Sequence, residues 1–115
     1  MKLLIESERL EELFSNFKII SKEHGMPFAK ILYRRIAELQ AYEKVQDLFN
    51  ANLGSPHFLK GDLKAYISIS LIKNLRIILD TSKISDDINE ILESRKIFIK
   101  GVVDYHGSKN KWIII

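Results

Sequence analysis

The first half of the chain carries apolar residues at helical spacing. Two runs have the three-to-four-residue period of a buried helix face, and they consist of Leu10, Leu13, Phe14, Phe17 and Ile20, then Phe28, Ile31, Leu32, Ile36 and Leu39. Ser7 is a suitable N-cap, and Gly25 followed by Pro27 separates the two runs. The pattern predicts helices over 8–24 and 27–41 that form an antiparallel hairpin. A short strand over 2–5 precedes them, and a further helical turn follows near Val45.

From Gly54 the period changes to that of β-strands. Residues 66–71 alternate between apolar and polar, Lys73-Asn74 is a tight turn, and 75–79 return as the partner strand. Phe98 to Gly107 has the composition of a buried strand, and Trp112 to Ile115 is a candidate last strand after a five-residue hairpin loop, 106–110.

Helices first and strands afterwards indicate the α+β class. We expect one domain over 1–115, in which the N-terminal helical hairpin packs on one face of a small, mostly antiparallel β-sheet. The sheet is expected within 57–115. A polar, acidic loop over 80–95 interrupts it, with one helical turn around 88–92.

The composition is that of an ordinary soluble globular protein, with 46% hydrophobic and 29% charged residues. No apolar run reaches the roughly 18 residues of a membrane span. No signal peptide is recognisable either, so the cytoplasm is the expected location and no membrane partner is expected. The chain has no cysteine, which excludes disulfides and thiolate metal sites. No histidine pair has metal-ligand spacing, and we expect neither a metal nor a small-molecule cofactor.

The net charge of +3 is unevenly distributed. Residues 1–50 hold eight basic and eight acidic residues, and residues 51–79 hold four basic residues and one acidic residue. Residues 80–95 hold two basic and five acidic residues, and residues 96–115 hold four basic residues and one acidic residue. The segments predicted as sheet therefore carry most of the positive charge. Clustered Lys and Arg favour a polyanionic partner, although a solvated basic face without a partner fits the charge equally well.

Candidate chemistry lies at the ends of the predicted strands. His24 precedes a helix end, where an imidazolium suits the helix dipole, and is interpreted as structural. If the strand ends converge, six side chains would surround one basic cleft: His57, Lys60, Arg76, Asp104, Tyr105 and His106. Lys73, in the turn before Arg76, is a further phosphate-binding candidate. The simpler interpretation is that these residues serve packing and turns.

This set suits the cleavage of an RNA phosphodiester by its own 2′-hydroxyl. The reaction needs a base and an acid near neutrality, which histidine supplies. It also needs fixed positive charge where the phosphorane develops negative charge, for which Arg76 and Lys60 are candidates. Tyr105 is suited to stacking on an unpaired base.

Three blocks of the sequence resemble the signature blocks of a family of bacterial toxins. They are His57-Phe58-Leu59-Lys60-Gly61-Asp62, Asn74-Leu75-Arg76-Ile77-Ile78 and Gly101-Val102-Val103-Asp104-Tyr105-His106-Gly107. The family is the RelE/ParE superfamily, and the HigB or "plasmid maintenance killer" branch is the most similar. The segment Arg34-Arg35-Ile36-Ala37-Glu38-Leu39 is similar to the second helix of that branch.

The resemblance implies a RelE-like fold and a ribosome-dependent mRNA endonuclease, or mRNA interferase. Such a toxin acts on ribosome-bound mRNA and is silenced by a HigA-type helix-turn-helix antitoxin. By the same resemblance, His57 and His106 are acid–base candidates and Asp104 is their orienter or partner. Tyr105 would contact the substrate, and Lys60 and Arg76 would bind phosphate. The division of labour between the two histidines stays open.

Two departures from the family pattern keep alternatives open. Leu75 stands where the family often has an aromatic residue, and the chain continues past Gly107 to an apolar end, Trp112 to Ile115. That end would add an edge strand, dock on the helices or offer a surface to the antitoxin. The alternative functions are a non-catalytic ParE-type toxin that inhibits DNA gyrase, and an inactive homologue that only binds its antitoxin.

Overall fold

The computed structural model describes residues 1–59, 65–106 and 109–114, and of His106, Lys109 and Asn110 it describes the backbone alone. The helices and strands of this part, in chain order, are β1 (Lys2–Ile5), α1 (Glu8–Ser15), α2 (Phe17–His24), α3 (Met26–Ala41), α4 (Val45–Asn50), β2 (His57–Phe58), β3 (Tyr66–Ser70), β4 (Leu75–Asp80), α5 (Ile88–Leu92), β5 (Lys96–His106) and β6 (Lys109–Ile114). No helix in the described ranges is long and apolar enough to cross a membrane.

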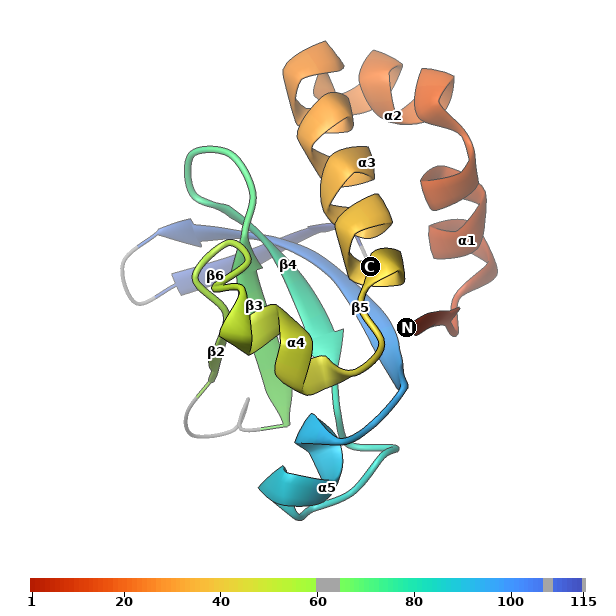
Figure 1. Cartoon of the computed structure of the whole chain (residues 1–115). Helices are drawn as coiled ribbons and strands as arrows, with labels where there is room; N and C mark the ends of the chain where they lie inside the picture. Colours follow the sequence, from red (N-terminus) through yellow and green to blue (C-terminus); the bar gives the residue numbers. More distant parts are fainter. Residues whose placement is uncertain (60–64, 107–108, 115) are drawn as a thin grey trace.

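The strands form one mixed sheet in the order β1-β5-β4-β3-β2, with β6 also paired to β5 (Figure 1). Strand β5 pairs with β4 along one edge, while β1 and β6 share its other edge. The β1–β5 pairing is parallel, and the other pairings are antiparallel. The predicted α+β class, with N-terminal helices on a mostly antiparallel sheet, is confirmed.

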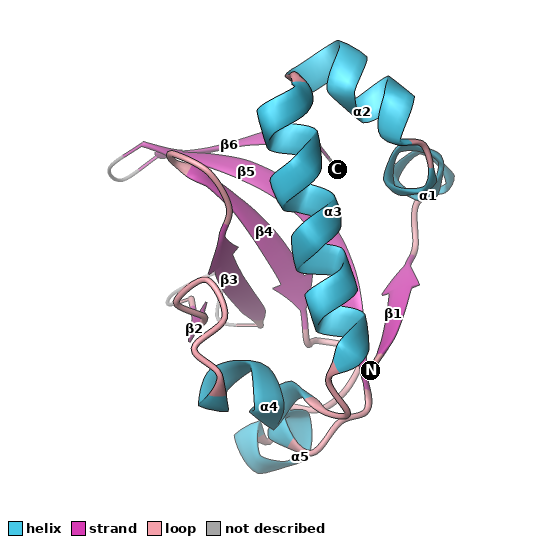
Figure 2. Ribbon diagram, turned by 45° about the horizontal axis from the view of Figure 1, so that its top comes forward, coloured by secondary structure: helices cyan, strands magenta, loops and turns pink. Residues whose placement is uncertain are grey.

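One face of the sheet forms the hydrophobic core with the helices. The inward-facing strand residues are almost fully buried, and they include Ile67, Ile69, Ile77, Leu79, Ile97, Ile99 and Val102. They belong to the same cluster as the buried helix residues Leu10, Phe14, Ile20, Leu32 and Leu39. Figure 2 shows α3 running along this side of the sheet. Because each buried aliphatic side chain contributes roughly 1.5–3 kcal/mol, this layer fixes which face of every strand points inward.

The helix predicted over 8–24 is in fact two helices, and that prediction was wrong at Asn16. The backbone of Asn16 is extended (φ −128°, ψ 94°), which ends α1 and begins α2. Its amide donates to the Leu13 carbonyl, and its side-chain oxygen accepts from the Ile19 amide at 3.3 Å. Asparagine competes well for backbone groups, so one residue caps both helices and lets the chain turn.

The predicted hairpin loop over 106–110 was also wrong, because the two strands pair further than expected. Tyr105 pairs with Asn110 and His106 with Lys109, so β5 reaches 106 and β6 starts at 109. Continued pairing satisfies backbone donors and acceptors that a five-residue loop would leave to water. An edge strand was one of the three alternatives for the segment 112–115. Its described part, 112–114, forms such a strand within β6.

The predicted turn at Lys73-Asn74, the helical turn near Val45 and the helical turn around 88–92 are confirmed. Lys73 adopts a positive φ of 55° in the turn between β3 and β4. The predicted first strand is β1, and its parallel pairing with β5 is what makes the sheet mixed.

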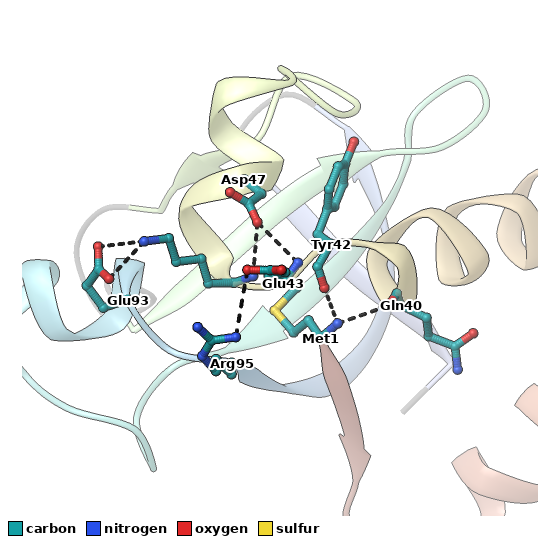
Figure 3. Close-up of polar contacts among 8 residues, drawn as sticks. Met1, Gln40, Tyr42, Glu43, Asp47, Glu93 and Arg95 are labelled. Carbon is teal, nitrogen blue, oxygen red and sulfur yellow. Dashed lines mark hydrogen bonds and ion pairs between the residues drawn. The ribbon is translucent and has the colours of Figure 1, made fainter.

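Polar contacts join the end of α3 to α4, α5 and β1 (Figure 3). The Asp47 carboxylate accepts the backbone amides of Glu43 and Lys44, each at 3.1 Å, and so caps the start of α4. The Lys44 ammonium pairs with Glu93 at 2.9 Å. The Met1 amine donates to the carbonyls of Gln40, at 2.9 Å, and Tyr42. These contacts hold three chain segments at one corner of the sheet.

We expect Asp47→Ala to lower the free energy of unfolding by about 1 kcal/mol, because two backbone amides at the start of α4 lose their shared acceptor. Urea unfolding followed by circular dichroism measures the change. Asp86→Ala, at an exposed carboxylate, is the matched control and should lie within about 0.5 kcal/mol of the wild type. Equal stability of the two variants would contradict the capping role.

Candidate functional site

The sheet face that points away from the core gathers several of the polar and aromatic residues. The strand register aligns His57 with Ser68 and Ile78, and Ser70 with Arg76, Val103 and Trp112. Residues directly opposite in a sheet share a face, and alternate residues of one strand do so too. The face therefore carries His57, Tyr66, Ser68, Ser70, Arg76, Val103, Tyr105 and Trp112. We call this surface the outer face.

Arg76 is the central charged group of the outer face. Its guanidinium donates to the Ser70 hydroxyl at 3.1 Å and lies over the Tyr105 ring, 5.1 Å from the ring centre. The side chain is half-buried, and none of the ion pairs among the described residues includes it. A guanidinium that is held between a hydroxyl and an aromatic ring, and that no carboxylate of the described residues neutralises, is available to an anion and is preorganised for it.

Tyr105 supplies the exposed aromatic surface beside this cation. Its side chain is 39% exposed, and its backbone amide donates to the Asn74 carbonyl at 2.8 Å. That bond anchors the end of β5 to the β3–β4 turn, next to the exposed Lys73. The ring is thus open to a planar ligand on a fixed strand.

Ser70 joins the outer face to the helical layer. Its carbonyl accepts from Arg35 Nε of α3 at 3.4 Å, while its hydroxyl accepts from Arg76. Arg35 in turn pairs with Glu38 at 2.9 Å, and Arg34 shares that carboxylate at 3.4 Å. Three guanidinium groups are therefore accompanied by one carboxylate, and the local charge is positive.

His57 begins β2, at the edge of the sheet beside β3. The loop before it is fixed by Gly54, which adopts a φ of +57° and whose carbonyl accepts from Ser70 N at 2.8 Å. A Cβ at Gly54 would lie only 2.6 Å from Ile69 Cγ2, so the approach requires glycine. His57 Nδ1 lies 3.2 Å from the Ser55 carbonyl. A carbonyl only accepts, so this contact is a hydrogen bond in the tautomer that has its proton on Nδ1, and that tautomer leaves Nε2 as an acceptor.

The structure brings Arg76 and Tyr105 into contact and places His57 on the same face. With strands spaced by about 4.8 Å and residues by about 3.4 Å, two strands and two residues separate the backbones of His57 and Arg76 by roughly 12 Å. Both side chains can span part of that distance.

Asp104 does not join this group. It lies opposite Leu75, so the register assigns it to the core-side face, away from Arg76 and Tyr105. His106 is the last residue of β5 and pairs with Lys109. It lies three strands and five residues from the position of His57, which corresponds to roughly 20 Å between backbones. The expected convergence of the two histidines is therefore not provided by the sheet, because β2 and β5 are not neighbours.

The remaining predicted residues lie at the margins. Lys73 is exposed in the β3–β4 turn, and Lys60 lies outside the described residues. Within the described ranges, no group of three or more His, Asp or Glu residues is arranged to hold a metal ion.

Sequence reasoning missed Ser68, Ser70, Tyr66 and Trp112, which line the outer face. The alternation Tyr66-Ile67-Ser68-Ile69-Ser70 was a sufficient signal for the first three, since it places their side chains together on the less apolar face. No sequence signal placed Trp112, because its position depends on the pairing of β6.

No protein-family model matches the chain, and no curated protein sequence matches it. Among solved structures, the chain is similar to a YoeB/ParE toxin from Agrobacterium tumefaciens, with a TM-score of 0.47 and 15% sequence identity. The alignment covers 97% of this chain and 98% of the other.

We expect inorganic phosphate at about 5 mM to raise the melting temperature relative to chloride at equal ionic strength, because an anion bound at Arg76 stabilises the folded state. Arg76→Gln should remove most of this shift. Arg34→Gln is the matched control, since Arg34 is 73% exposed on α3, and it should keep the shift. Equal shifts in both variants would show that Arg76 is not an anion site.

Proposed function

We propose that the chain is the toxin of a type II toxin–antitoxin system and acts as an mRNA endonuclease of the RelE/ParE kind, most similar to the HigB branch. In this proposal it cleaves ribosome-bound mRNA through attack of the 2′-hydroxyl and so inhibits translation. The observation that carries the proposal is the Arg76 guanidinium on the outer face, held by Ser70 and Tyr105 and without an ion-pair partner among the described residues. The sequence blocks around His57, Arg76 and Tyr105 support it independently.

Each residue has a role in this reaction that its chemistry allows. Arg76 would stabilise the negative charge of the phosphorane, since fixed donors aimed at developing charge give the largest catalytic effect. Tyr105 would stack on a base beside the scissile phosphate. His57, through Nε2, would serve as acid or base.

The other predicted site residues keep in this proposal the roles that the sequence analysis gave them. His106 is the second acid–base candidate, and Asp104, two residues before it in β5, is its proposed partner rather than that of His57. Lys60 and Lys73 would bind flanking phosphates. We further propose that a HigA-type helix-turn-helix antitoxin silences the protein and that the ribosome delivers the mRNA.

A second candidate function is non-catalytic inhibition of DNA gyrase by a ParE-type toxin. The separation of roughly 20 Å between the backbones of His57 and His106, estimated from strand and residue spacings, favours it. A binding protein needs a cationic, aromatic surface but no convergent acid and base.

Induction of the wild-type chain in a bacterial host should arrest growth and produce new mRNA 5′ ends on translating ribosomes. Arg76→Gln should reduce the cleavage rate by about 100-fold or more, the loss typical for removal of a donor to a developing negative charge. His57→Ala and His106→Ala should each abolish the new ends. Mapping of mRNA 5′ ends after induction is the measurement.

The matched controls are Arg34→Gln and His24→Ala, which should cleave as the wild type does, because neither residue lies on the outer face. Growth arrest with DNA breaks and intact mRNA would select the gyrase function. Wild-type cleavage by His106→Ala would remove that residue from the site, and wild-type cleavage by Arg76→Gln would overturn the proposed mechanism.

A further inference from the structure

The outer face contains a small hollow beside Arg76. Its lining is mostly aromatic and aliphatic and consists of Leu59, Tyr66, Ser68, Arg76, Ile78, Val103, Tyr105 and Trp112. Four strands and the residue after β2 contribute to it, and Trp112 comes from the C-terminal strand β6.

The hydroxyl of Ser68 has no hydrogen-bond partner among the described residues, although the side chain is fully buried. Burial of an unpaired hydroxyl lowers the stability of the folded state. Alanine would fill the same space without that cost. A buried orphan donor in the lining of a hollow therefore indicates a group that gains its partner when a ligand is bound.

Tyr66 and Trp112 line the same hollow as this hydroxyl. Their rings meet edge to face at a centroid distance of 6.4 Å, near the upper end of the range for aromatic pairs. The contact joins β6 to β3, and in the sheet order β5 and β4 lie between these two strands. The indole is half-exposed and stands on an edge strand. The Trp112 wall of the hollow thus stands on an edge strand and meets the Tyr66 ring at a long centroid distance.

The hollow lies directly beside Arg76, the candidate phosphate-binding residue. Ser68 and Arg76 are diagonal neighbours on adjacent strands, because Ser68 pairs with Ile78 and Arg76 stands two residues before Ile78. Diagonal neighbours lie about 7–8 Å apart. A cation at one end, aromatic rings along the sides and an unpaired hydroxyl at the base are the groups that bind the phosphate, the plane and the edge of a nucleotide.

We infer that this hollow is a nucleobase-binding pocket. A base of single-stranded RNA moves the Trp112 indole away from Tyr66 and stacks against the indole. The edge of the base forms a hydrogen bond with Ser68 Oγ, while Arg76 binds the adjoining phosphate. The inference rests on the proposed function, and it names the part of the proposed endonuclease site that would recognise a base. It assigns base discrimination to Ser68 and a stacking role to the C-terminal strand.

Trp112 is the single tryptophan of the chain, so intrinsic fluorescence reports directly on this pocket. The four nucleoside 3′-monophosphates, and ribose 5-phosphate as a probe without a base, are titrated into the full chain. We expect at least one nucleotide to change the Trp112 emission and to bind about tenfold more tightly than the weakest-binding nucleotide of the four. Ribose 5-phosphate should leave the emission unchanged. Arg76→Gln should lower the binding affinity for all four nucleotides by the same factor.

Ser68→Ala is the decisive variant. It should melt at the wild-type temperature or above it, because the deleted hydroxyl has no partner in the part of the chain that the structure describes. It should also bring the four nucleotide affinities to within about threefold of one another, since one hydrogen bond separates affinities by about three- to tenfold. Ser68→Cys, of similar size and with a weaker donor, should be intermediate and replaces the alanine variant if that does not fold. Ser82→Ala, at an exposed serine, is the control and should keep the wild-type discrimination.

Unchanged discrimination in Ser68→Ala, or an equal response of Trp112 to ribose 5-phosphate, would overturn the inference. The outcome is separable from that of the proposed function. Cleavage of mRNA without any response of Trp112 to nucleotides would reject the pocket alone. Nucleotide binding that depends on Ser68, without cleavage in the cell, would reject the endonuclease alone.

Discussion

The pairing of β5 on both of its edges is the constraint on which the rest of the molecule depends. One edge is occupied by β4, and the other is divided between the first strand of the chain and the last. This arrangement joins both ends of the sequence to one central strand, so the core against α1, α2 and α3 closes only when β5 is in register. Because the side-chain period of a strand is two, the same register decides which side chains of β5 reach the core and which reach the outer face.

The candidate site follows from that division. Val102 goes inward and Val103 outward, so Tyr105 lies with Arg76 and Asp104 does not. The guanidinium is then positioned by two neutral groups, Ser70 Oγ and the Tyr105 ring, and keeps its charge for a ligand. The neighbouring carboxylate, Glu38, is engaged by Arg34 and Arg35 on α3. Positive charge is therefore retained on the outer face at modest cost, since the site is only half-buried.

The C-terminal strand gives this site a wall that the resembling sequence blocks do not contain. Trp112 lies opposite Val103 and its ring meets that of Tyr66, so β6 and β3, which are distant in sequence, share one aromatic contact. Ile78 and Ser68 beside this contact are buried, and the Ser68 hydroxyl has no partner in the described part of the chain. A folded chain that keeps such a group usually has a functional reason to do so, because a hydroxyl-to-methyl change would relieve the penalty.

The sequence by itself determined the order and type of nearly all elements, because apolar periodicity and turn residues act locally. It predicted the α3 helix, the β3–β4 hairpin with its Lys73 turn, and the helical turn at 88–92. It also singled out Arg76 and Tyr105 as a site. The sequence-based prediction was wrong at Asn16, because this side chain hydrogen-bonds to the backbone and ends a helix that the apolar pattern would have continued.

Only the tertiary structure decided which of the chosen residues meet. Strand order places β2 three strands away from β5, so His57 shares a face with Arg76 while its position lies far from that of His106. Sheet order and register are set by packing between distant segments and leave no trace in the spacing of residues along the chain. For the same reason Ser68 and Trp112, 44 positions apart in the sequence, line one hollow that no local pattern indicates.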